Sequence, residues 1–249
     1  MTSCMLTPWW VDRRVDGRPD ALGGVDATGI LDFHSAGVRS FASDLGGAAD
    51  VDARGYLQLA HSLIVDRVRP VYALNDLQPV SQTLQRGRGS CSQRMAVLDA
   101  VARRAGVATR SHGVLIDGRF WYPRFPRMGR LVPSEIVLAW PEFFLEGQWV
   151  SATELFGNVD DLAKSGGGFS NADGETLFDA LARTAVDWEG QTSTPEVCSA
   201  CDLSGNVLSD LGRFDSRDGL FAAYGQTLCW GARRLAEPVL GRRSANATA

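Results

Sequence analysis

The chain has 249 residues, of which 45% are hydrophobic, 22% charged and 9% aromatic, and its formal net charge is −4. This apolar content is ordinary for a globular protein and large enough for a sizeable core, which excludes disorder along the whole chain. Mean hydropathy is −0.09, and no apolar run approaches the ~18 residues that span a bilayer, so a membrane protein is excluded. The acidic balance is also untypical of a general nucleic-acid binder.

Arginine and cysteine usage indicate a source and a compartment. Lys164 is the only lysine among 25 basic residues, a ratio typical of a GC-rich, actinobacterium-like genome. The N-terminus lacks a basic segment followed by a long apolar stretch, so we expect no secretory signal and a cytoplasmic location. The five cysteines, an odd number in a reducing compartment, predict free thiols.

Periodicity predicts two helices in the first half of the chain. Residues before 54 give few clear periods, whereas residues 54–68 repeat apolar side chains at intervals of three and four. After a polar loop, the clearest helix of the chain begins at Cys91 and ends at Gly106. Ser90 is a good N-cap and Gln93 stands three residues later, so the two complete a capping box.

The period changes after this helix, and the second half of the chain is predicted to contain three strands and further helices. The predicted strands cover 107–116, 136–145 and 148–153, with an arginine- and aromatic-rich loop at 117–135. A tight turn at Glu146-Gly147 makes the last two strands antiparallel neighbours. Helices are predicted at 175–187 and 218–235, with loops at 157–175 and 190–216. This order predicts an α+β fold, not alternating βαβ units.

Cys91 is the candidate nucleophile. It occupies the first helical position, where free backbone N–H groups and the positive end of the helix dipole favour an anion. A thiol at such a position has its pKa lowered from ~8.5, and the thiolate is the reactive form. The alternative is that Cys91 is a small buried residue on the inner face of its helix.

Four spaced motifs carry a resemblance to a known family. They are Gly89–Arg94 at the start of the Cys91 helix, Ala105–Arg110 before the first strand, Leu138–Glu142 on the second strand and Trp149-Val150 on the third. They resemble the transglutaminase-like superfamily, whose pattern is Gly-x-Cys, Gly-Ile-Pro-Ala-Arg, His-x-Trp-x-Glu and Trp-Val-x-x-Asp. The resemblance covers residues 54–156. It implies a papain-like core in which the helix carrying the cysteine packs on an antiparallel sheet. We expect a single domain, 1–249, in which 1–53 and 157–249 are elaborations with extra helices.

The resemblance implies a Cys-His-Asp triad, and this sequence keeps one member of it. Leu138 occupies the position of the family's histidine. Thr153 occupies the position of the aspartate, or Glu154 does if the register slips by one residue. Leucine cannot accept a proton, so the ordinary mechanism is not available at that position.

Another histidine could replace the missing base. His112 lies on the first predicted strand, and if Arg110, His112 and Val114 face inward its ring could reach the Cys91 sulfur. The alternative is that His112 is a packed strand residue with a neighbouring hydrogen-bond partner. His34 and His61 are weaker candidates, because they lie outside the matched motifs or on the preceding helix.

Three functions follow from a cysteine without its usual base. The leading prediction is a cysteine-dependent enzyme of acyl-transfer or related type in specialised metabolism, because a thioester substrate tolerates the loss of general-base help better than an amide does. The second is a catalytically silent binding module that reuses the cleft. The third is a cysteine-dependent lyase or cyclase that forms no acyl-enzyme.

The arginine- and aromatic-rich loop predicts how a substrate is held. Arg119, Tyr122 and Arg124, together with Trp140, are the candidate substrate-binding residues, because arginine forks recognise carboxylates and phosphates and aromatic rings supply a stacking wall. We therefore expect a small-molecule or carrier-protein-bound anionic substrate, with no nucleic acid and no membrane as partner. The alternative is a solvated loop with its aromatic rings packed on the core.

No metal and no other cofactor is expected. Cys198-x-x-Cys201 has no second cysteine pair and no nearby histidine, whereas a zinc site needs about four ligands. Glu142 is expected on the same face of its strand as Trp140, and a buried glutamate there needs a partner such as an arginine.

Overall fold

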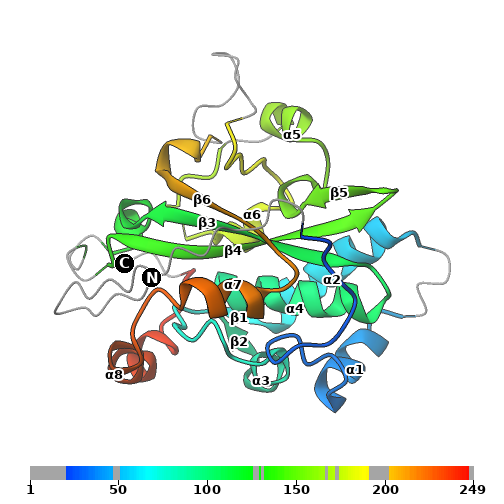
Figure 1. The fold of residues 1–249 in the computed structure, drawn as a ribbon, viewed down its shortest axis with the longest axis horizontal. Coiled ribbons are helices and arrows are strands. Elements are labelled where there is room, and N and C mark those ends of the chain that lie inside the picture. Colours follow the sequence, from blue (N-terminus) through cyan, green and yellow to red (C-terminus); the bar gives the residue numbers. More distant parts are fainter. Residues whose placement is uncertain are drawn as a thin grey trace.

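A four-stranded antiparallel sheet, of order β5-β4-β3-β6, forms the centre of the protein (Figure 1). The computed structural model describes residues 21–46, 51–125, 129, 132–165, 168–171, 174–190 and 202–246. The strands of the sheet are β3 (Thr109–Asp117), β4 (Glu135–Leu145), β5 (Gln148–Ser151) and β6 (Val207–Phe214). A separate parallel pair joins β1 (Arg69–Pro70) to β2 (Arg88–Gly89).

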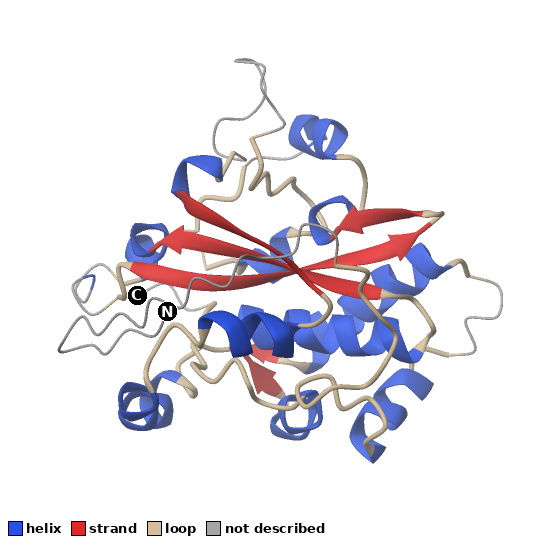
Figure 2. Ribbon diagram, in the orientation of Figure 1, coloured by secondary structure: helices blue, strands red, loops and turns tan. Residues whose placement is uncertain are grey.

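Helices gather mainly on one face of this sheet, with α4 and α7 running along it and α5 on the opposite side (Figures 1 and 2). The helices are α1 (Ala36–Ser43), α2 (Ala53–Arg67), α3 (Val80–Arg86), α4 (Cys91–Arg104), α5 (Val159–Ser165), α6 (Leu177–Ala180), α7 (Arg217–Tyr224) and α8 (Trp230–Leu240). Helices packed on an antiparallel sheet confirm the predicted α+β class.

The helix α4 is the central helix of the fold, since every residue from Gln93 to Arg103 is buried. The predicted capping box is present: the Ser90 hydroxyl accepts from the Gln93 N–H, and the Gln93 side chain accepts from the Ser90 N–H. Gly106 follows the helix with a φ of +83°, which an L-residue with a side chain rarely adopts. Capping at both ends therefore fixes the position of Cys91 at the first residue of α4.

The hairpin of β4 and β5 also follows the prediction. Glu146 and Gly147 have φ values of 54° and 82°, so both central residues of the turn are left-handed, as a two-residue hairpin requires. The register pairs Glu142 with Ser151 and Leu145 with Gln148.

Several loops predicted from composition contain regular structure. The helix α1 forms where few periods were found, α3 lies in the predicted polar loop, and α5 lies in the predicted loop 157–175. The strand β6 lies in the predicted loop 190–216, and its edge position leaves most of its residues exposed or half-buried. Such short or half-exposed segments carry weak periodicity, and pairing with β3 decides the conformation of β6.

The predicted helices near the C-terminus have different limits. Of 175–187, only Leu177–Ala180 forms α6. The segment 218–235 divides into α7 and α8, because Gly225 adopts a φ of +76° directly after α7. The helix α8 also continues through Pro238, which lies in its last turn.

The described chain bears on two further expectations. None of its helices combines the length and the apolarity needed to cross a membrane. Cys91 is a free thiol as predicted, but Cys229 forms a disulfide bond, so the expectation of free thiols throughout is wrong. Cys198-x-x-Cys201 lies outside the described residues.

Candidate functional site

A cavity of about 410 Å³ opens beside the start of α4. Its walls come from residues 71–74, the first residues of α4, the 3₁₀ helix η2 (Gly118–Arg124), the first half of β4, and α8. Most of the lining side chains are apolar, including Val71, Leu74, Phe120, Trp121, Val137, Leu138, Leu177, Leu228 and Leu240. We call this space the Cys91 cavity. Its size and apolar walls are typical of small-molecule sites.

Cys91 lies in the wall of this cavity, half-buried, and its thiol is neutral. Burial raises its pKa to about 12. The Arg94 and Arg217 guanidiniums and a hydrogen bond from the Phe178 backbone favour the thiolate, whereas the Asp179 carboxylate opposes it. Position at a helix start predicts a lowered pKa. The opposite result follows because desolvation of the charged sulfur outweighs these favourable contacts.

Leu138 lines the same cavity, so the position that the resemblance assigns to a histidine base presents an aliphatic side chain there. On β4 it pairs with Val114 of β3. Thr153 is buried in the turn after β5, and Glu154 beside it is half-buried; neither lines the cavity. No acid–base partner for the thiol stands at the expected positions.

Asp76 is the ionisable group of this site that the sequence did not indicate. It lines the Cys91 cavity, and burial raises its pKa, while a hydrogen bond from Ser92 and the Arg217 charge lower it in part. Arg217 is fully buried and donates to the Ala139 carbonyl at 3.0 Å and to the Ser92 Oγ at 2.6 Å. The loop around Asp76 carries no motif, so only the fold brings this residue to the cavity that Cys91 also lines.

Of the predicted substrate-binding residues, Arg124 lines the cavity. Its guanidinium is buried and donates to Asn171 Oδ1 at 2.8 Å, to the Ala245 carbonyl at 3.0 Å and to the Glu175 carbonyl. These bonds hold the segments around the cavity together and leave fewer donors for a ligand.

The other three predicted binding residues do not line the cavity. Arg119 is exposed and binds Asp117, and Tyr122 is 43% exposed. Trp140 is 1% exposed, and its indole donates to Ser151 Oγ at 2.9 Å. The structure therefore separates these three side chains from Cys91.

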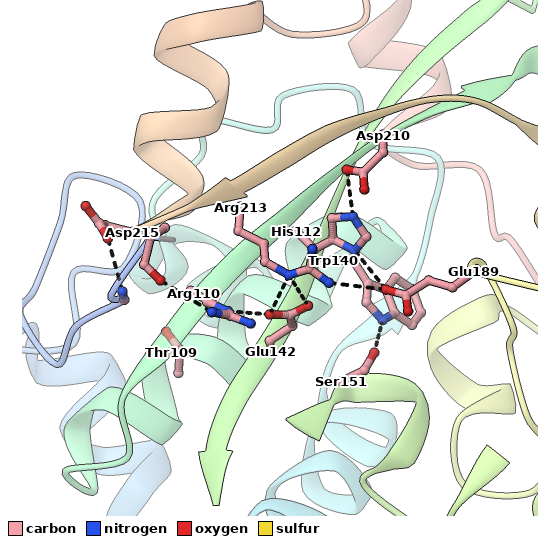
Figure 3. Close-up of polar contacts among 12 residues, drawn as sticks. Thr109, Arg110, His112, Trp140, Glu142, Ser151, Glu189, Asp210, Arg213 and Asp215 are labelled. Atoms are coloured by element: carbon pink, nitrogen blue, oxygen red, sulfur yellow. Dashed lines mark hydrogen bonds and ion pairs between the residues drawn. The ribbon is translucent and has the colours of Figure 1, made fainter. Parts of the chain in front are cut away.

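His112 lies in a polar cluster with Glu142, Glu189 and Asp210 (Figure 3). Thr109 faces α4, where it accepts from Arg103 at 2.7 Å, and strand alternation places Arg110 and His112 on the opposite face. His112 Nε2 is 2.9 Å from Asp210 Oδ1, and its Nδ1 is 3.7 Å from Glu189. His112 thus has its own partners and does not line the Cys91 cavity.

Glu142 is the central carboxylate of this cluster (Figure 3). It accepts from Arg110, and from Arg213 at 3.1 Å, which confirms that a buried glutamate here is paired with arginine. We call His112, Glu142, Glu189, Asp210, Arg110 and Arg213 the His112 cluster. Ligand atoms of His112, Glu142 and Glu189 lie within 4.8 Å of one another, as a metal site requires. The two arginine charges oppose a divalent cation, and we interpret the cluster as an ion-pair network.

The two remaining histidines have different surroundings. His61, on α2, is buried, and its Nε2 lies 2.6 Å from the Phe178 carbonyl oxygen. The imidazole also stacks on the Phe178 ring. Burial lowers its pKa. His34 is exposed, and neither ring lines the Cys91 cavity.

Comparison with known proteins agrees with the motifs. A family model described as the transglutaminase-like superfamily matches residues 52–153, which contain α4 and β3 to β5. No curated protein matches the chain significantly. Among solved structures, "Crystal structure of a putative protease from Parabacteroides distasonis ATCC 8503" is similar at 10% identity and a TM-score of 0.33. That similarity covers 49% of this chain and 24% of the other, so the chain spans about a quarter of that protein.

Proposed function

Residues 52–153 belong to the transglutaminase-like superfamily, and from this premise we propose that the chain binds an apolar small molecule in the Cys91 cavity. The observation that carries the proposal is an apolar cavity of about 410 Å³ at the family's cysteine, with a leucine in place of the base. An apolar cavity of this kind favours the binding of an apolar ligand over a reaction that proceeds through a charged thiolate.

The protonation state of Cys91 supports binding over ordinary thiol catalysis. With a pKa of about 12, roughly one thiol in 10⁵ is ionised at pH 7. Loss of general-base help lowers the rate of such reactions by a further ~10²–10⁴. A neutral thiol in an apolar wall instead packs as a small hydrophobic side chain.

The ligand that suits this cavity has an apolar body and one polar group. Polar side chains in the wall include Tyr72, Asp76 and Thr227, and burial raises the pKa of both Tyr72 and Asp76. These groups favour a ligand that offers a neutral hydrogen-bonding group there. The long apolar wall from η2 to α8 favours an aliphatic or aromatic body.

Displacement of a neutral apolar fluorophore tests the proposal. N-phenyl-1-naphthylamine is expected to bind, and Ala236→Phe, on α8 in the cavity wall, to weaken binding at least tenfold by filling the space. Ala232→Phe is the matched control, because Ala232 lies on the same helix and lines neither the cavity nor the neighbouring groove. Equal binding by both variants and the wild type contradicts the proposal.

A second candidate function, acyl transfer, is favoured by the contacts that stabilise the Cys91 thiolate. The Phe178 backbone bond and the nearby Arg94 and Arg217 charges lower the cost of forming the anion. In this reaction the Cys91 sulfur attacks the carbonyl carbon of a thioester and its proton passes to the departing thiolate. An acyl-Cys91 enzyme and a free thiol result, and a second nucleophile then takes the acyl group.

Intact-mass measurement distinguishes the two functions. Acyl transfer predicts one acyl adduct on the wild type after incubation with a thioester, and none on Cys91→Ala. An unmodified wild type that still binds the fluorophore supports the binding role, or a lyase or cyclase that forms no acyl-enzyme.

The biological setting is a further part of the proposal. The arginine-rich composition supports an actinobacterial source. For the acyl-transfer function we propose a biosynthetic role and a small-molecule or carrier-bound anionic substrate. The cytoplasmic location expected from the sequence needs a test of its own. Because disulfides are rare in reducing compartments, the disulfide at Cys229 opposes the cytoplasmic location. Differential thiol labelling of Cys229 in source cells tests that location.

A further inference from the structure

A second hollow, of about 520 Å³, lies against a different face of α8 from the Cys91 cavity. Figure 1 places α8 below the sheet at the left. Five arginines line this hollow, which we call the arginine groove: Arg86, Arg88, Arg233, Arg234 and Arg242. Among the described residues that line it, Glu237 is the only carboxylate, and it accepts from the Leu74 N–H at 2.6 Å.

The positive charge of the arginine groove is not neutralised by ion pairs within the described chain. Arg86 donates to the Gln78 amide, and Arg234 stacks over the Trp230 ring at 5.6 Å. Among the described residues, no carboxylate forms a hydrogen bond or ion pair with Arg88, Arg233 or Arg242. Burial lowers the pKa of Arg233, and the nearby Asp76 and Glu237 charges offset part of this shift.

Local charge here opposes the charge of the whole chain, which is −4. Cations collected in a concave site raise the local positive potential and the local concentration of anions. Arginine forks bind phosphate oxygens in pairs, with geometric specificity that a diffuse charge lacks. Five guanidiniums around one hollow offer more hydrogen-bond donors than a single phosphate group can accept from. The groove therefore favours a ligand with more than one phosphate group.

We propose that the arginine groove binds the diphosphate group of an organic ligand. This site is separate from the residues that the sequence predicted for anion recognition, since Arg119 and Arg124 do not line it. The proposal stands on the charge and shape of the groove and does not depend on what occupies the Cys91 cavity.

Two sources of a diphosphate fit the neighbouring surfaces. Val71 and Ala73 line both the arginine groove and the Cys91 cavity, so an aliphatic chain attached to the diphosphate is positioned to reach apolar walls. Trp230, 69% exposed at the groove, offers a ring on which a planar base can stack. A prenyl-type diphosphate and a nucleoside diphosphate share the group that the arginines recognise.

Calorimetric titration with inorganic pyrophosphate tests the shared chemistry. We expect binding that weakens as salt rises, and at least tenfold weaker binding for the double variant Arg234→Gln and Arg242→Gln, whose exposed side chains are removed without opening the core. The double variant Arg39→Gln and Arg104→Gln, which removes two exposed arginines outside the groove, is the matched control and keeps wild-type affinity. Absence of pyrophosphate binding at low salt, or equal weakening by the control, overturns the proposal.

Two further titrations identify the source of the diphosphate. If geranyl diphosphate binds more tightly than pyrophosphate, and Ala236→Phe removes this gain in affinity, the ligand is of the prenyl type. If ADP binds more tightly than pyrophosphate, and Trp230→Ala removes this gain in affinity, the ligand is of the nucleoside type. Affinities of both at or below that of pyrophosphate contradict an organic ligand. If pyrophosphate binds and the neutral fluorophore does not, the groove is retained and the cavity proposal fails.

Discussion

The Cys91 cavity and the His112 cluster divide between them what a thiol enzyme usually holds together. The cavity has the cysteine and the space for a ligand, but its walls are mostly apolar. The cluster has a histidine, three carboxylates and two arginines, but these groups bind one another. A cysteine at a helix start is therefore not sufficient for an ionised thiol, because its surroundings decide its pKa.

Net pKa shifts have opposite signs in the two regions, although burial acts in the same direction in both, because the charged groups differ in their partners. In the cavity, desolvation raises the pKa of both Cys91 and Asp76. In the cluster, burial also disfavours the charged form of Asp210, but bonds from Gly212 and His112 and the Arg213 charge lower its pKa overall. Variants that remove a charged group from the cluster, or introduce a base into the cavity, therefore test this comparison directly.

Removal of the central carboxylate of the His112 cluster is expected to have the largest effect. In Glu142→Ala, Arg110 and Arg213 lose their shared partner, and both are at least half-covered. Breaking such a pair leaves charge uncompensated, and we expect a loss of about 2–3 kcal/mol in the free energy of unfolding by urea titration.

Glu146→Gln is the control for this variant, because Glu146 pairs with Arg54 at the exposed hairpin turn. Surface pairs contribute little to stability, so we expect little change. Equal loss in the two variants contradicts the description of the His112 cluster as a buried network.

Leu138→His places a base in the Cys91 cavity and is expected to have the next largest effect. An imidazolium near the sulfur favours the thiolate, and each unit by which the thiol pKa falls raises the thiolate fraction tenfold at neutral pH. We expect the chloroacetamide labelling rate of Cys91 at pH 7, read from its own peptide by mass spectrometry, to rise about 10- to 100-fold. Leu138→Asn, polar but not titratable in this range, is the control and gives a smaller increase.

The sequence predicts the elements that carry local signals. The capping box at Ser90 and Gln93 marks the start of α4, and the left-handed turn at Glu146 and Gly147 marks the β4–β5 hairpin. These signals depend on neighbours within four residues, so periodicity and turn chemistry are sufficient to find them.

The sequence does not predict what distant pairing decides. The partner of β6 is β3, about a hundred residues away, and this pairing gives His112 its contact with Asp210. Asp76 reaches the cavity through a loop without a motif. The Cys91 pKa depends on the walls around the sulfur, which come from segments far apart in the chain, so helix position alone gives the wrong direction.

The raised pKa of Cys91 makes the stability of the protein depend on pH. The ordinary thiol pKa is 9.0 and the folded value is about 12, so the unfolded chain ionises first. The contribution of the neutral thiol is complete below pH 9 and is lost as the pH rises from 9 to 12. At pH 10 the expected loss is about 1.4 kcal/mol, and the difference between wild type and Cys91→Ala in urea titrations at pH 7 and pH 10 measures it. A difference that stays constant with pH indicates an ordinary, hydrated thiol.

His112→Ala is expected to have the smallest effect on Cys91, and that result is the sharpest test of the separation between the two regions. The imidazole binds Asp210 and lies near Glu189, and it does not line the cavity. Its removal therefore leaves the labelling rate of Cys91 within about twofold of wild type from pH 7 to pH 10, since less than ~0.4 kcal/mol of interaction is at stake. A tenfold or larger decrease at neutral pH, in a variant that unfolds at the wild-type urea concentration, restores His112 as the base for Cys91. In that case the two regions act as one site.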